Sequence, residues 1–135
     1  LPIGAVLTNK KLCDVLKPGD HGSTFGGNPV TCAAANVVID KVGNDAFYKT
    51  VTEKGEYIKS EIEKSGFSVR GLGMMRGIVV DQSIQKALAK ELFESGLLVL
   101  TAGHDVIRLL PPLTITYEEI DKGLEILTST LSKYK

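Results

Sequence analysis

The second half of the sequence alternates between two hydrophobic periodicities, and this alternation constrains the fold more than any other feature. Short apolar or period-two runs predict strands, and longer runs with apolar residues at helical spacing predict helices. In chain order these are strand, strand, helix, strand and strand, at residues 67–70, 74–81, 84–95, 97–101 and 106–110, and then a last helix that follows Thr116 and includes Leu131. Glycine-containing bends join the strands in pairs, which favours antiparallel pairing. The pattern predicts a compact α+β unit with helices on one side of a mainly antiparallel sheet.

Capping signals place the starts of the two helices in this unit. Thr116 and Glu119 have the spacing of a capping box at the start of the last helix. Ser83 is expected to cap the helix over residues 84–95. Arg76 alternates with apolar residues in the second strand and is therefore expected to be exposed. The last helix is expected to bury four side chains, those of Ile120, Leu124, Leu127 and Leu131.

Two helices are predicted before this unit. Val30, Ala33, Ala34, Val37, Val38 and Val42 lie on one face of a helix over residues 29–42. Asn28 is its expected cap, with Pro29 at its first position. Residues 45–65 predict a second helix with many charges, and Gly55 lies inside it.

The start of the chain does not belong to the same pattern. Residues 3–7 form an apolar, partly β-branched run that predicts a buried strand, and residues 9–16 predict a short helix. There is no initiating Met, so we expect the chain to be a piece of a longer protein. We interpret residues 1–45 as the tail of another domain with the start of a connecting helix, and residues 46–135 as a small C-terminal domain.

Composition excludes several functional classes. Among the 135 residues, 16 basic and 16 acidic side chains cancel, so there is no charge signal for binding nucleic acid or an anionic membrane. No apolar run reaches the roughly 20 residues that span a bilayer. Cys13 and Cys32 do not form a disulfide framework, and we expect a reducing, cytoplasmic location. His21 and His104 have no partner at ligand spacing, so no metal site is predicted.

Residues 21–29, His-Gly-Ser-Thr-Phe-Gly-Gly-Asn-Pro, form the first candidate site. The segment is rich in glycine and hydroxyl groups and leads directly into a predicted helix. Backbone and hydroxyl donors at the start of a helix can hold an anion such as a phosphate. An ordinary loop with a good helix cap would have the same composition.

Arg108 is the second candidate. It lies between Ile107 and Leu109 in an apolar strand, and a guanidinium in such a place is costly to bury without a partner. Its planar fork matches a carboxylate through two parallel hydrogen bonds. A structural salt bridge, or the exposed face of an edge strand, would explain the residue equally well.

Four segments resemble the class III aminotransferases, which use pyridoxal phosphate. They are Leu-Pro-Ile-Gly-Ala at 1–5, His-Gly-Ser-Thr-Phe-Gly-Gly-Asn-Pro at 21–29, Gly-Leu-Gly-Met-Met-Arg-Gly at 71–77 and Val-Ile-Arg-Leu-Leu-Pro-Pro-Leu at 106–113. Each segment alone is a weak signal, but their order and spacing agree along the whole chain. The resemblance implies the C-terminal part of a fold type I, α/β transferase, with residues 1–45 completing the large cofactor-binding domain.

The resemblance also implies roles for single residues. The hydroxyl of Thr24 would bind the cofactor phosphate of the neighbouring subunit in a homodimer, with Ser23 beside it. Arg108 would hold the α-carboxylate of the amino acid or of 2-oxoglutarate.

The family's Schiff-base lysine lies immediately before the motif that here begins at Leu1. The chain therefore contains no catalytic residue of its own, and residues 1–135 alone are expected to be inactive. A different class of protein stays open, in which the residues from Phe67 onward form a stand-alone domain that binds an amino acid through Arg108.

Overall fold

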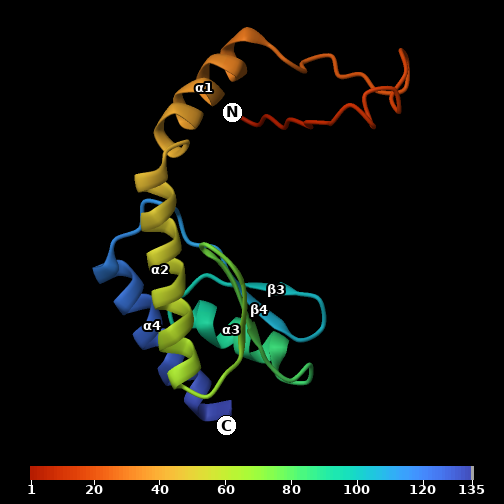
Figure 1. Cartoon of the computed structure of the whole chain (residues 1–135). Helices are drawn as coiled ribbons and strands as arrows, with labels where there is room; N and C mark the ends of the chain where they lie inside the picture. Colours follow the sequence, from red (N-terminus) through yellow and green to blue (C-terminus); the bar gives the residue numbers. More distant parts are fainter. Residues whose placement is uncertain (135) are drawn as a thin grey trace. The chain divides into compact units, whose positions relative to one another are not determined.

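The structure is a computed structural model that describes residues 1–134. Its elements are α1 (Pro29–Val42), α2 (Asp45–Lys64), β1 (Val69–Leu72), β2 (Met75–Val79), α3 (Gln85–Glu94), β3 (Leu100–Ala102), β4 (Val106–Leu109), α4 (Tyr117–Leu131) and a 3₁₀ turn (Ser132–Tyr134) (Figure 1). The chain divides into two compact units, Leu1–Phe47 and the part from Tyr48 on, and each is described by itself.

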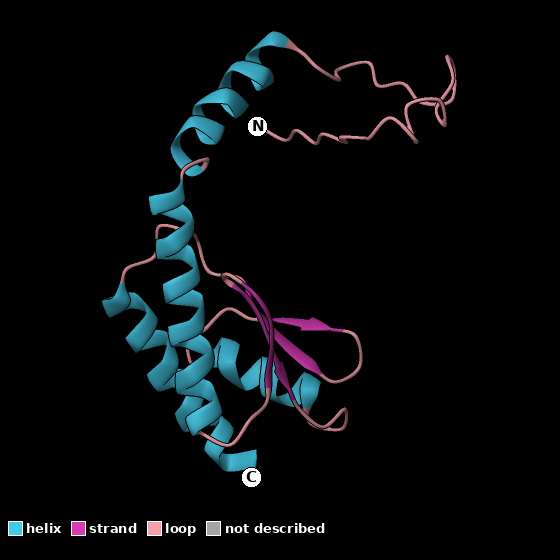
Figure 2. Cartoon of the chain, in the orientation of Figure 1, coloured by secondary structure: helices cyan, strands magenta, loops and turns pink. Residues whose placement is uncertain are grey.

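The second unit is an antiparallel sheet covered by helices. The strand order is β1-β2-β4-β3, and all three neighbouring pairs are antiparallel. Figure 2 shows the helices of this unit beside the sheet. Side chains from α2, α3, α4 and one face of the sheet form a single apolar core. Its buried members are Ile58, Ile62, Val69, Met74, Ile78, Val80, Leu88, Leu92, Ile107, Ile120, Leu124, Leu127 and Leu131. The predicted α+β architecture is confirmed, including the four apolar residues of the last helix.

The β1–β2 hairpin has a two-residue turn. Leu72 pairs with Met75, so Gly73 and Met74 make the turn, and Gly73 has a φ of +53°. Glycine at the first position of a two-residue turn matches the twist of the flanking strands. The tip of this hairpin lies against α2, because a Cβ on Gly55 would stand only 2.0 Å from the carbonyl oxygen of Gly73.

Caps explain where the longer helices begin. The side chain of Asn28 accepts a hydrogen bond from Thr31 N at 3.0 Å, with Pro29 at the first helical position, as predicted. The capping box of Thr116 and Glu119 is present in both directions.

Ser83, by contrast, does not cap α3, so that prediction is wrong. Both its amide and its hydroxyl donate to Asp81 Oδ1, at 2.7 and 2.6 Å, which closes a local turn instead. The helix begins two residues later at Gln85, whose side chain turns inward and donates to the carbonyl oxygen of Val106 at 2.8 Å.

Residues 3–7 and 9–16 form neither the predicted strand nor the predicted helix. Residues 1–28 contain no helix or strand, and residues 1–27 are exposed. Isolated turns are present, such as Leu12 N to Asn9 O at 3.0 Å. A strand needs a neighbour to pair with, and the described residues offer none to this segment. The apolar run alone therefore could not decide the conformation.

Arg76 is buried, contrary to the sequence prediction. Its side chain is 2% exposed and lies on the same face of β2 as Ile78, which is in the core. Arg76 Nη2 donates to Glu56 at 2.7 Å, and Nη1 donates to the Gly71 carbonyl oxygen at 3.0 Å. Side chains of β2 alternate between the two faces of the sheet as predicted, but Arg76 points to the core face and not to the solvent face.

Candidate functional site

The hydroxyl-rich loop lies in the first unit, directly before α1. A turn closes it, with the Gly26 amide donating to the Ser23 carbonyl oxygen at 3.2 Å. Asn28 Nδ2 donates to the Phe25 carbonyl oxygen at 3.1 Å and ties the loop to the helix start. The side chains of Ser23 and Thr24 are exposed, and their hydroxyls form no hydrogen bond with any described residue. Both hydroxyls are therefore free to donate to a ligand.

The start of α1 itself offers few donors to an anion. Pro29 has no N–H, Thr31 N donates to the side chain of Asn28, and Cys32 N donates to the Asn28 carbonyl oxygen at 3.1 Å. Within the described residues, only Val30 keeps a first-turn amide without such a bond. Recognition of an anion here would therefore depend on the hydroxyls of the loop more than on the helix terminus.

Arg108 lies in β4, which is an inner strand hydrogen-bonded to β2 on one side and to β3 on the other. Its neighbour Ile107 points into the core, so Arg108 points to the opposite face of the sheet. Arg108 Nε is buried without a hydrogen-bond partner. Among the described residues Arg108 forms no ion pair. Neither an edge strand nor a structural salt bridge within this part of the chain explains the residue.

Two residues that the sequence analysis did not single out lie in the same row across the sheet as Arg108. Arg108 pairs in register with Gly77 of β2, and Gly77 pairs with Arg70 of β1. Arg70 Nη2 is bound to Asp105 Oδ1 at 2.9 Å, so its charge is already partnered. Strand register, which the sequence pattern does not specify, was needed to find this row.

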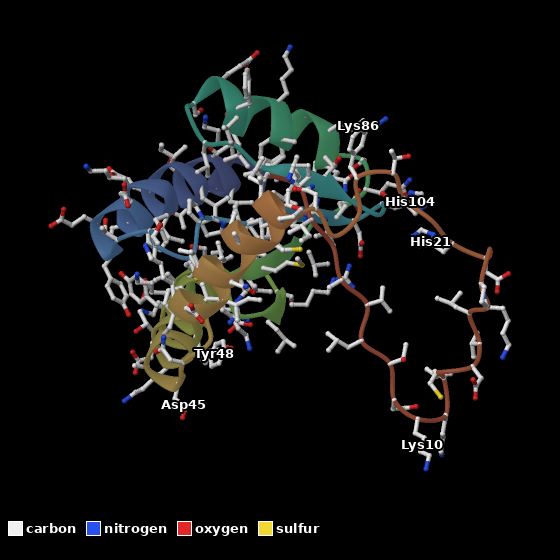
Figure 3. All side chains as sticks on the ribbon, turned by 90° about the horizontal axis from the view of Figure 1, so that it is seen from above. Lys10, His21, Asp45, Tyr48, Lys86 and His104 are labelled. Atoms are coloured by element: carbon white, nitrogen blue, oxygen red, sulfur yellow. The ribbon has the colours of Figure 1, made fainter. Side chains whose placement is uncertain are left out.

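The remaining candidates carry no site. His21 is exposed on the loop before α1, and His104 is exposed in the β3–β4 turn (Figure 3). Among residues 1–134 no group of His, Cys, Asp and Glu could hold a metal ion, and Cys13 and Cys32 are free. None of the described helices has the length and apolar character needed to cross a membrane.

Comparison with known proteins covers nearly the whole chain. Residues 1–131 match the family described as aminotransferase class-III. The chain is 41% identical over 140 residues to the acetylornithine aminotransferase of Caldanaerobacter subterraneus subsp. tengcongensis, covering 99% of this chain and 35% of that protein. It is 44% identical over 139 residues to the same-named protein of Lactococcus lactis, covering 97% and 36%.

Solved structures agree with the sequence matches. The acetylornithine aminotransferase of Elizabethkingia anophelis superposes with a TM-score of 0.79 at 36% identity, covering 94% of this chain and 36% of that one. An ornithine aminotransferase from Toxoplasma gondii gives a TM-score of 0.78 at 29% identity, covering 91% and 31%. The chain thus spans about a third of the length of these relatives, and it has the fold of the C-terminal segment of a fold type I transferase. The chain belongs to the class III aminotransferase family.

Proposed function

We propose that the chain is the C-terminal segment of a pyridoxal-phosphate-dependent acetylornithine aminotransferase. The whole enzyme would move an amino group from N-acetylornithine to 2-oxoglutarate in arginine biosynthesis. Two relatives that carry that name are 41% and 44% identical over nearly the whole chain, which supports this donor. Residues 1–45 would complete the large cofactor-binding domain, and residues 46–135 would form the small domain. We further propose a cytoplasmic homodimer, on the resemblance to the family.

The observation that carries the proposal is the position of Arg108. A guanidinium held on an inner strand, with a buried Nε that has no partner and no ion pair among the described residues, can bind a carboxylate. Both the amino donor and 2-oxoglutarate have an α-carboxylate, so one arginine could position both substrates in turn. The match over residues 1–131 includes both units, which favours the aminotransferase over a stand-alone amino-acid-binding domain.

The loop before α1 fits the phosphate of the family's cofactor. The hydroxyls of Ser23 and Thr24 are exposed and free, and hydroxyl groups donate well to phosphate oxygens. We propose that Thr24 holds the phosphate bound to the neighbouring subunit, with Ser23 beside it. The bound cofactor supplies the carbonyl group that accepts and returns the amino group. We propose, on the family resemblance, that the lysine that carries the cofactor lies outside residues 1–135, so these residues alone should show no transamination.

Arg108→Ala in the full-length enzyme should raise KM for both substrates, with less effect on kcat. Loss of a charge-assisted, two-point contact costs about 1.5–3 kcal/mol, or roughly 10- to 100-fold in KM. Arg108→Lys keeps the charge but loses the fork, so its KM should be intermediate. Steady-state kinetics with each substrate varied in turn checks this. An unchanged KM for 2-oxoglutarate would rule out the role of Arg108.

Thr24→Ala should weaken cofactor retention, measured as the dissociation constant for pyridoxal phosphate. The loss of one hydrogen bond to a charged group predicts an effect of about tenfold or more. Thr8→Ala, another exposed threonine in the same segment, is the matched control and should have no effect.

Hybrid dimers test whether Thr24 acts across the subunit interface. A dimer of one Thr24→Ala subunit and one subunit without the catalytic lysine should keep one intact site only if Thr24 serves its neighbour. If Thr24 served its own subunit, every lysine-bearing site in the hybrid would show the weakened cofactor binding.

The fold is shared by enzymes with different amino donors, since an ornithine aminotransferase superposes at a TM-score of 0.78. Ornithine and 4-aminobutyrate are therefore the competing donors. Glutamate formation from 2-oxoglutarate with each of the three donors separates them. The proposal expects the highest kcat/KM with N-acetylornithine, and preference for ornithine or 4-aminobutyrate would replace that assignment while leaving the family intact.

A further inference from the structure

Arg70, Gly77, Arg108 and Leu100 form one row across the four strands of the sheet. The register pairs Arg70 with Gly77, Gly77 with Arg108, and Arg108 with Leu100. Residues directly opposite in antiparallel strands point to the same face, with Cβ atoms about 5 Å apart. The whole row therefore lies on the face of the sheet away from the helices, and the only member without a side chain stands next to Arg108.

The backbone does not explain why residue 77 is glycine. The φ angle of Gly77 is not positive, so a residue with a side chain could adopt the same backbone conformation. Space is the constraint instead. A Cβ at this position would stand 2.9 Å from Val106 Cγ1 and 3.7 Å from Arg70 Cγ. Gly77 is buried, which shows that neighbouring side chains close over it.

Arg108 is held close to the sheet at the same place. Its Nε is buried although it has no hydrogen-bond partner, so packing and not hydrogen bonding encloses the middle of the side chain. On one side its neighbour in the row is Leu100, and on the other side it is Gly77. Because Gly77 and Arg108 are directly opposite, a Cβ at residue 77 would stand about 5 Å from the Cβ of Arg108. The atoms that it would meet first belong to Val106 and Arg70, which lie on the same face of the sheet.

β2 itself cannot easily shift to make room. Arg76, the residue before Gly77, points to the opposite face and donates to Glu56 of α2 at 2.7 Å. The same strand is paired with β1 on one side and β4 on the other. A side chain added at residue 77 would therefore displace neighbouring side chains more readily than the strand.

We propose that Gly77 is a positioning residue for substrate carboxylate binding, because its missing side chain sets the direction of the Arg108 guanidinium. The inference rests on the proposed function of Arg108. It goes beyond that function by assigning a role to a residue that does not touch the substrate. Small substituents at residue 77 should impair binding of carboxylates and leave the chemical step largely intact.

A double-mutant cycle in the full-length enzyme tests the proposal, with glutarate as a dicarboxylate that cannot react. Isothermal titration calorimetry of Gly77→Ala should show binding of glutarate about tenfold weaker, in line with the cost of one misplaced methyl group. KM for 2-oxoglutarate should rise by a similar factor, with kcat at saturation retained. In an Arg108→Ala background, Gly77→Ala should have no further effect, because Gly77 acts through Arg108.

Val106→Ala separates positioning from packing. It removes the atom that a methyl group at residue 77 would meet at 2.9 Å. The Gly77→Ala/Val106→Ala protein should recover thermal stability but not glutarate affinity. Recovery of both would reduce Gly77 to a packing role and overturn the inference, as would additive effects of Gly77→Ala and Arg108→Ala. If Arg108→Ala leaves glutarate binding unchanged, the proposed function of Arg108 fails first.

Discussion

Arg76 is the residue whose environment differs most from a surface arginine. Its guanidinium is nearly inaccessible, yet its partner Glu56 has a side chain that is 59% exposed. The pair therefore places a buried cation against a solvated anion, and removal of either partner has a different consequence. Without Arg76, Glu56 can be hydrated. Without Glu56, Arg76 is left with one carbonyl acceptor in a site that water hardly reaches.

Glu56→Ala should therefore destabilise the chain more than Glu53→Ala on the same helix. Glu53 forms an exposed pair with Lys49 at 3.8 Å, and such pairs contribute little. The midpoint of urea unfolding, measured for both variants at neutral pH, checks the difference. Equal midpoints would show that the Arg76–Glu56 pair contributes no more to the free energy of unfolding than the exposed Lys49–Glu53 pair.

The same pair predicts a pH dependence. The hydrogen bond from Arg76, and then its charge, lower the pKa of Glu56 from the ordinary value of 4.5. A carboxylate with a lowered pKa stabilises the fold fully above its ordinary pKa, and this contribution is lost as pH falls through the lowered value. The gap between the wild-type and Glu56→Ala midpoints should therefore shrink on acidification below pH 4.5.

At the scale of single elements, two helical glycines differ in the space available for a side chain. Gly55 in α2 lies against the hairpin tip, and a Cβ there would be 2.0 Å from a backbone oxygen. Gly123 in α4 borders a mainly apolar cavity of about 400 Å³, and a Cβ there would meet only Leu97 Cδ1, at an ordinary 3.5 Å.

Alanine at these two positions should change stability in opposite directions. Gly123→Ala gains helix propensity and should stabilise by up to about 1 kcal/mol. Gly55→Ala gains the same propensity but must push α2 from the hairpin, so a net loss of about 1–3 kcal/mol is expected. Thermal unfolding of both variants measures the difference. A stabilising Gly55→Ala would show that α2 and the hairpin are not in tight contact.

The strands that the sequence predicted correctly are those whose partners lie nearby in the chain. The four strands pair with one another within about 40 residues, so hydrophobic periodicity and turn glycines were sufficient to predict an antiparallel sheet, although not the order of its strands. The strand expected at residues 3–7 has no such neighbour among the residues that the structure describes, and its apolar run stays exposed. The cap expected at Ser83 failed because Asp81 competes for the same hydroxyl and amide. Local competition of this kind depends on geometry that a residue pattern does not contain.

The candidate site was predictable in part for the same reason. Arg108 could be selected because a lone charge in an apolar strand is conspicuous. Arg70 and Gly77 are 38 and 31 positions away from it in sequence, and only the strand register brings them into its row. Composition predicts an anion-binding loop at residues 21–29, and only the family resemblance selects Ser23 and Thr24 within it. Most first-turn amides of α1 are already hydrogen-bonded, so the hydroxyls are the main available donors.

For the molecule as a whole, the two units predict unequal resistance to proteolysis. Residues 1–27 are exposed without helix or strand, whereas the second unit has a continuous core. Limited trypsin digestion of the isolated chain should therefore cut first after Lys10 and Lys11, because exposed segments of this kind are preferred sites. Lys54, which donates to the Ile115 carbonyl oxygen, should be cut late. Mass spectrometry of early fragments checks the order, and early cleavage at Lys54 would contradict it.

The inner position of β4 has a consequence for insertions and deletions. Both edges of this strand are hydrogen-bonded, and Ile107 and Arg108 point to opposite faces. A shift by a single residue would exchange these faces, placing a guanidinium in the apolar core and an isoleucine where a substrate is expected. The number of residues in the turn from Gly103 to Asp105 is therefore as strict a requirement as the identity of Arg108. Most surface turns tolerate changes in length, but an insertion or deletion in this turn should abolish function.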